Sequence, residues 1–183
     1  MTSFFRSACA ALALTIVTAG GALAASAPSA KLLVMEKFFG GRAVAQGTFH
    51  SSLFGPDRQV AAKFHGLWNG RVLTLIEDIA YSDGEKDQKI WKLEKTGSGT
   101  FIGRRDDLVG DASVFTDEMG RVHLKYTAVT GGRNLTFDDI LQLNADGTVL
   151  NTTSVSYYFI HVGDVELHFR RVGRRVDTRG RQR

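Results

Sequence analysis

Two acidic residues break the pattern of the strands in which they lie, and they are the first candidates for chemistry. Glu77 lies in phase with the apolar residues of one alternating run, and Asp139 lies in phase with those of another. Because side chains alternate across a strand, both carboxyl groups point where apolar residues point. An inward carboxylate can anchor the polar end of a ligand or, with a raised pKa, act as a general acid or base. Glu77 and Asp139 are therefore candidate ligand anchors and the two weak candidates for catalytic residues.

Each acid also has an interpretation that involves no ligand. Burying an unpaired charge costs several kcal/mol. Glu77 or Asp139 can instead pair with an inward base, for which Arg105, in phase with Phe101, is the candidate, or lie at a barrel rim open to water. The sequence leaves these alternatives open.

Large aromatic side chains accompany the acids on the same predicted faces. They can line a pocket or simply fill a core. With the acids, they complete the candidate ligand-binding set: Trp68, Leu75, Glu77, Tyr81, Trp91, Arg105, Tyr126, Phe137 and Asp139.

Motifs of other chemistries are missing from the sequence. It contains no nucleophile elbow, Walker loop or dinucleotide fingerprint. The five histidines have no close ligand spacing, and Asp106-Asp107 lacks the regular spacing of a calcium loop. We therefore predict no metal and no cofactor.

The elements that position these residues are predicted strands joined by tight turns. Asn69-Gly70 and Asp83-Gly84 bracket one long alternating run, which indicates two successive hairpins. Turn signals recur about every dozen residues, and proline is rare, which is typical of an all-β sandwich or barrel. Consecutive hairpins favour an antiparallel up-and-down barrel of about 8–10 strands, which either fills itself or holds one small ligand. Besides the run between the two turns, the expected strands are 44–49, 58–68, 89–96, 100–105, 111–116, 121–129, 134–144, 148–160 and 165–170, preceded by a short amphipathic helix within 30–39 that plugs one end.

The two ends of the chain differ from the body. Residues 1–24 read as a cleaved signal peptide, with Arg6, a short apolar region and Ala22-Leu23-Ala24 before the cut. The one cysteine, Cys9, lies inside it, so the mature protein is expected to be thiol-free and periplasmic or secreted. Of the formal net charge of +4, Arg6 contributes +1 and the arginine-rich tail +4, which leaves the body at about −1. We predict a barrel domain over 30–171 and a basic disordered tail over 172–183, with peripheral membrane contact through the tail as its functional alternative. The tail has no interleaved aromatic residues, so no nucleic-acid partner is predicted.

The order of motifs along the whole mature body resembles a family. The chain is similar to the bacterial envelope proteins catalogued as domain of unknown function 3833. This resemblance implies a lipocalin-like, calycin-type barrel in Gram-negative bacteria and implies no activity. It rests on Phe38-Phe39-Gly40-Gly41, Gly66-x-Trp68-x-Gly70, Leu73-x-Leu75-x-Glu77-Asp78, Tyr81-x-Asp83-Gly84, Trp91, Gly103, Asp107-x-Val109-Gly110, Asp138-Asp139 and Val162-Gly163-x-Val165-x-Leu167-x-Phe169.

Three functional hypotheses follow. The favoured one is a binding module that holds a small apolar or amphipathic, lipid-like molecule inside the barrel, with Glu77 or Asp139 at its polar end. The second is an enzyme on the same scaffold, with Glu77 as acid or base assisted by Tyr81 or Asp139. The third is an envelope structural or partner-binding protein with a filled barrel.

Overall fold

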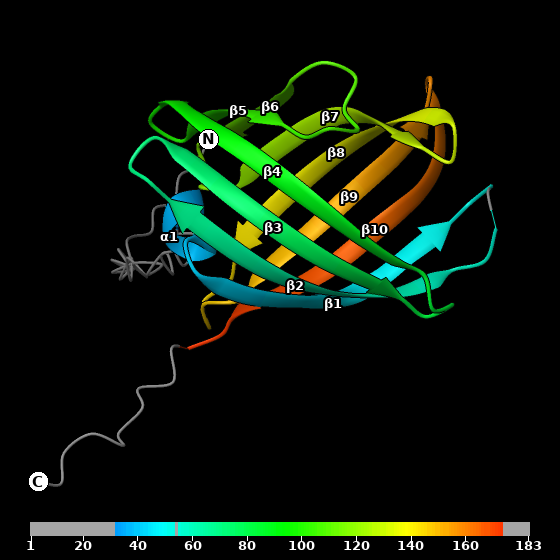
Figure 1. Ribbon diagram of the computed structural model, residues 1–183, viewed down its shortest axis with the longest axis horizontal. Coiled ribbons are helices and arrows are strands. Elements are labelled where there is room, and N and C mark those ends of the chain that lie inside the picture. Colours follow the sequence, from blue (N-terminus) through cyan, green and yellow to red (C-terminus); the bar gives the residue numbers. More distant parts are fainter. Residues whose placement is uncertain (1–31, 54, 174–183) are drawn as a thin grey trace, which may run out of the picture.

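Ten strands, each paired with its neighbours in chain order, form a closed antiparallel barrel in the computed structural model (Figure 1). The structure describes residues 32–53 and 55–173. The last strand pairs with the first, so the barrel has no free edge along its ladder. This confirms the predicted all-β up-and-down barrel. The strands are β1 (Arg42–Ser51), β2 (Arg58–Trp68), β3 (Val72–Tyr81), β4 (Lys86–Gly97), β5 (Thr100–Arg104), β6 (Ala112–Thr116), β7 (Val122–Thr130), β8 (Arg133–Leu143), β9 (Val149–Tyr157) and β10 (Ile160–Arg171).

The hairpin turns set the register that decides which residues point inward. Gly70 and Gly84 adopt φ values of 96° and 91°, which an L side chain rarely adopts. The Asn69 carboxamide oxygen also accepts hydrogen bonds from the backbone N–H groups of Arg71 and Val72. These two turns pair β3 with β2 on one side and β4 on the other, as predicted.

One predicted strand is wrong. The range 148–160 contains the whole of β9, a turn at Tyr158 and Phe159, and the first residue of β10, so the last strand is longer than the expected 165–170. Tyr158 has a φ of 55°, a conformation unusual for a bulky residue. Two aromatic residues therefore make a tight turn where the sequence carries no glycine or asparagine signal.

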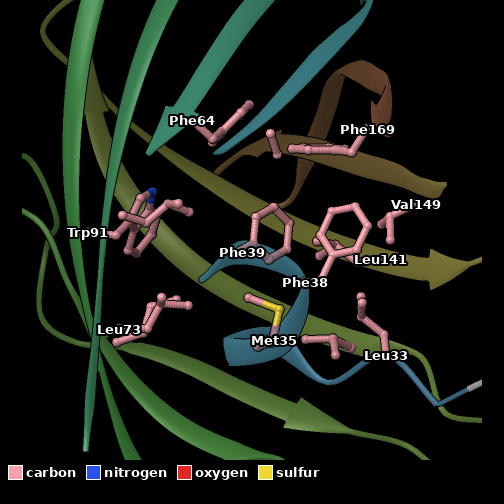
Figure 2. Packing of buried hydrophobic residues seen from close by; sticks show 14 of the residues in the cluster. Leu33, Met35, Phe38, Phe39, Phe64, Leu73, Trp91, Leu141, Val149 and Phe169 are labelled. Carbon is pink, nitrogen blue, oxygen red and sulfur yellow. The ribbon is translucent and has the colours of Figure 1, made fainter. Parts of the chain in front are cut away.

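A short helix, α1 (Met35–Phe39), closes one end of the barrel. The helix lies within the expected range 30–39, and just before it the Leu33 backbone N–H donates to the Gly120 carbonyl of the β6–β7 turn. Phe38 and Phe39 point into the barrel with Met35, among side chains from several strands (Figure 2). We call this end the helix end and the opposite one, which carries the β1–β2, β3–β4, β5–β6, β7–β8 and β9–β10 connections, the far end.

The helix packs directly on the β2 backbone at a glycine. A Cβ at Gly66 would lie 1.7 Å from the Phe39 carbonyl oxygen, and the Gly66 N–H donates to the Gly41 carbonyl at 2.7 Å. Phe39 makes edge contacts with Phe64 and Phe169, at centroid distances of 6.3 and 5.6 Å. The helix end of the interior is therefore a packed core, which leaves the far half as the place for any ligand.

Candidate functional site

The interior of the barrel changes character between its two halves. At the helix end the inward side chains are buried and apolar, as for Leu73, Leu93 and Val149. In the far half many inward side chains keep part of their surface accessible, which indicates that water reaches this half of the interior. The partly accessible inward side chains of the far half are Phe49, Glu77, Ile79, Tyr81, Lys89, Arg105, Leu108, Tyr126, Leu135, Phe137, Tyr157, Val165 and Leu167.

Glu77 lies on the wall of this far half. Its cross-strand partners are Phe64 on β2 and Lys89 on β4, and its carboxylate accepts a hydrogen bond from the Trp91 indole. Burial among protein atoms raises the pKa of Glu77 to about 7; the positive charge of Arg105 lowers it and the negative charge of Asp139 raises it further. Glu77 is thus surrounded by protein yet partly accessible, which places it on a wall that water reaches.

Asp139 lies deeper, on β8, with 5% of its surface exposed. Its Oδ1 accepts hydrogen bonds from the Thr153 hydroxyl and, at 3.2 Å, from Nδ2 of Asn151. Burial raises the pKa of Asp139 to about 6, while these two hydrogen bonds lower it. The chain neighbours Asp78 and Asp138 face outward, as predicted, so each strand contributes one inward acid.

Arg105 follows the last residue of β5 and covers the aromatic side of the site. Its guanidinium carbon lies 4.5 Å from the Trp91 ring centroid and 5.2 Å from that of Tyr126. Its ion pair is with Asp107, at 2.5 Å between Nε and Oδ1. Burial alone would raise the pKa of Asp107, but hydrogen bonds from Arg105 and Lys89 bring it below its ordinary value. Arg105 thus acts on Glu77 through its charge alone. Its ion-pair partner is Asp107, and not Glu77 or Asp139 as the sequence alternative proposed.

Three rings form a continuous aromatic wall beneath this guanidinium. Trp91 meets Tyr126 edge to face at a centroid distance of 5.1 Å, and Tyr126 stacks on Phe137 at 4.9 Å. Burial holds the pKa of the Tyr126 phenol well above its ordinary value, so the phenol stays protonated near neutral pH. The site therefore combines flat apolar faces with hydroxyl and carboxyl groups, a composition suited to an amphipathic molecule.

The other predicted site residues lie apart from this cluster, except Leu75, which is the cross-strand partner of Trp91. Trp68 lies at the helix end, where the Lys95 Nζ is 5.9 Å from its ring centroid, and Leu75 is 4% exposed within the packed core. Tyr81 lies near the far end, with the Arg58 guanidinium carbon 3.9 Å from its ring centroid. The structure therefore brings together Glu77, Trp91, Arg105, Tyr126, Phe137 and Asp139, and does not bring Tyr81 to Glu77.

Sequence reasoning missed five polar contributors. Lys89 bridges Asp87 and Asp107 at 2.9 and 3.0 Å, and Asn151 and Thr153 donate hydrogen bonds to Asp139. Lys89 could have been found, because it is in phase with Trp91 and Leu93. Asp107 lies in a loop, where alternation gives no signal.

A separate hollow of about 850 Å³ lies on the outside of the barrel, across β10, β1, β2, β3 and β4. Its lining includes the exposed, outward residues Ala61, Lys63, Ala80 and Lys86. It also includes inward residues of the same strands: Ala45, Ala62, Ile79, Asp87 and Phe169. We place the chemistry in the far half of the interior, where the two perturbed acids lie.

Two further structural findings bear on function. Within residues 32–53 and 55–173, no three His, Cys, Asp or Glu side chains are grouped so that they could hold a metal ion. Over the same ranges, every helix is too short or too polar to cross a bilayer.

Comparison with known proteins gives a family and a fold. A family model described as "Protein of unknown function (DUF3833)" matches residues 14–171. No curated protein matches the chain. Among solved structures, the S-type phycobiliprotein lyase CPES from Guillardia theta is similar, with a TM-score of 0.56, 10% identity, and coverage of 78% of this chain and 94% of the lyase chain. At this identity the likeness shows the fold alone.

Proposed function

From the premise that this chain belongs to the DUF3833 family of unknown function, we propose that it is a binding module for a small apolar or amphipathic molecule, which it holds in the far half of its barrel. The observation that carries the proposal is the contrast within one interior: packed and apolar at the helix end, accessible and lined by aromatic and carboxyl groups at the far end. The apolar part of the ligand lies along Tyr126 and Phe137, and its polar end reaches Glu77 or Asp139.

The energetics of the site support this assignment. Buried carboxyls with no cation in contact cost free energy in the folded state. Asp139 and Glu77 both have raised pKa values, which measure that cost. A ligand that forms hydrogen bonds with these groups offsets part of this free-energy cost. The two buried carboxyl groups therefore lower the stability of the free protein and favour ligand binding.

The test is mass spectrometry of an organic extract of protein purified from its native compartment. We expect a stoichiometric small molecule from the parent and its loss from the Glu77→Gln, Asp139→Asn double variant. The matched control is Asp78→Asn, Asp138→Asn, which makes the same changes on the outer face and should keep the molecule. Equal recovery from all three proteins would contradict the placement in the far half.

A second function, an enzyme that uses Glu77 as acid or base, is favoured by one observation. The pKa of Glu77 lies at about 7, where a carboxyl group can both accept and donate a proton near neutral pH. The similar structure is named a lyase, so the same fold carries an enzyme there. If this chain is an enzyme, incubation of the recovered molecule with the parent, and not with Glu77→Gln, changes its mass.

We also propose that the protein is exported to the periplasm or secreted, and that its basic tail contacts anionic membrane surfaces. Both segments lie outside the described residues, apart from the first two residues of the tail. The proposal rests on the A-x-A site at Ala22-Leu23-Ala24 and on the five arginines after Arg171. Amino-terminal sequencing of the mature protein should begin at Ala25, and removal of 172–183 should abolish salt-sensitive sedimentation with anionic vesicles.

A further inference from the structure

The charges that face the far half of the interior do not balance. Among the described residues, seven charged side chains face it: Arg58, Glu77, Asp87, Lys89, Arg105, Asp107 and Asp139. Four are acids and three are bases. The excess of acids gives this half of the interior a negative charge, whereas the arginine-rich tail is positively charged.

Ion pairs already engage all three cations. Arg58 binds Asp83 and Glu85 of the β3–β4 turn. Arg105 binds Asp107, and Lys89 bridges Asp107 and Asp87. An anion that enters the barrel would have to compete with carboxylates held in place by the chain itself. Among the described residues, no cation lies in ion-pair contact with Glu77 or Asp139, whose hydrogen bonds come from neutral groups: the Trp91 indole, the Thr153 hydroxyl and the Asn151 amide.

A third acceptor lies beside the acids. The carbonyl oxygen of the Asn151 side chain is buried and receives no hydrogen bond, while its Nδ2 donates to Asp139 and, at 3.1 Å, to Thr153. A buried acceptor without a donor costs about 1–3 kcal/mol. The hydrogen-bonding capacity left over at this site therefore belongs to acceptor oxygens. A matching ligand must supply hydrogen-bond donors.

We infer that the polar end of the ligand is a cation that carries N–H donors, such as a protonated amine, and that it binds between Glu77 and Asp139 with its apolar part against Tyr126 and Phe137. This inference deepens the proposed function and rests on it. An ammonium group supplies several N–H donors and one positive charge, which matches the acceptors and the excess of acids.

The groups that oppose or assist the cation come from several strands. Arg105 and Lys89 repel it, and their repulsion is reduced by Asp107 and Asp87. Tyr126 stays neutral. Entry of a positive charge stabilises the ionised forms of Glu77 and Asp139, so binding should release protons at pH values near and below the pKa of Glu77, about 7.

The test uses three amphiphiles of one chain length, decylammonium, decanoate and decanol, titrated by calorimetry into the full mature protein below their micellar concentrations. We expect decylammonium to bind at least about tenfold more tightly than decanol, and decanoate to bind more weakly than decanol. In the Glu77→Gln, Asp139→Asn double variant, decylammonium and decanol should bind with about equal affinity. The outer-face control Asp78→Asn, Asp138→Asn should keep the full preference.

The outcomes separate this inference from the function on which it rests. Binding of decanol without a preference for decylammonium, or a preference that survives in the double variant, would overturn the inference and leave the binding module standing. Absence of binding by all three probes to the folded protein would overturn both. If the double variant does not fold, the single Glu77→Gln variant must show a reduced preference, and an unchanged one contradicts the inference.

Discussion

Replacing Glu77 by glutamine should change the pH dependence of stability in a direction that the structure fixes. Burial raises the pKa of Glu77 from 4.5 to about 7 in the folded state. The folded chain therefore holds a proton that the unfolded chain releases between these two pH values, and the free energy of unfolding falls as pH rises through this window. Above about pH 7 the folded protein bears the full cost of an ionised, buried carboxylate.

The magnitude follows from the shift. At about 1.4 kcal/mol per pKa unit, the difference from 4.5 to about 7 amounts to at most about 3.5 kcal/mol, and water that reaches Glu77 reduces it. Glutamine keeps an acceptor for the Trp91 indole and has no charge to bury. The variant should therefore match the parent at about pH 4.5 and exceed its free energy of unfolding by about 1–3 kcal/mol at about pH 8.

The assay is urea denaturation of both proteins over this pH range, followed by tryptophan fluorescence. Asp78→Asn is the control, because it makes the same kind of change at the exposed neighbouring residue on the outer face. A Glu77→Gln variant that is less stable than the parent at about pH 8, or a difference that stays constant with pH, would refute the reasoning.

Three other predictions concern the packing and the electrostatics of the barrel. Gly66→Ala should lower the free energy of unfolding by at least about 2 kcal/mol in urea denaturation, because its Cβ would lie 1.7 Å from the Phe39 carbonyl oxygen; an unchanged midpoint would show that the helix can move away. Phe39→Ala should cost about 3–5 kcal/mol by calorimetry, because Phe39 is 2% exposed in the core, and a cost below about 1 kcal/mol would mean that the helix does not seal the barrel. Arg105→Met should raise the pKa of Glu77 above about 7 in an NMR titration of the carboxyl carbons, because the positive charge of Arg105 lowers it in the parent; an unchanged pKa would mean that Arg105 does not act on Glu77.

Much of the barrel could be predicted because local signals agree with tertiary pairing. The Asn69-Gly70 and Asp83-Gly84 turns fix a register, and a one-residue slip would turn Leu73, Leu75 and Glu77 outward. The burial pattern of β2, which alternates from Val60 to Gly66, follows the sequence pattern directly.

The remaining elements depend on contacts that alternation does not encode. The β9–β10 turn is made by Tyr158 and Phe159, which are common strand residues, and a hydrogen bond from the Leu33 N–H to the Gly120 carbonyl holds the segment before the helix. The tertiary fold decides both features.

The candidate site could be predicted in part for the same reason. Glu77 and Asp139 were identified by phase alone, and Arg105 by its phase with Phe101. Phase gives the direction of a side chain and not its height along the barrel, so Trp68 and Tyr81 were grouped with residues from which the structure separates them. The Arg105–Asp107 pair lies in a loop, where no period exists to predict it.

The central claim is that the far half of the interior, and not the outer hollow, binds a small molecule. The most direct test is to record intermolecular nuclear Overhauser effects between bound decanol and the protein, with aromatic and methyl groups labelled. If the molecule binds in the far half of the interior, the decyl chain contacts Tyr126, Phe137 and Leu167, which face the interior. Contacts to Ala61 and Ala80, which line the outer hollow, with none to the inward residues, would contradict it.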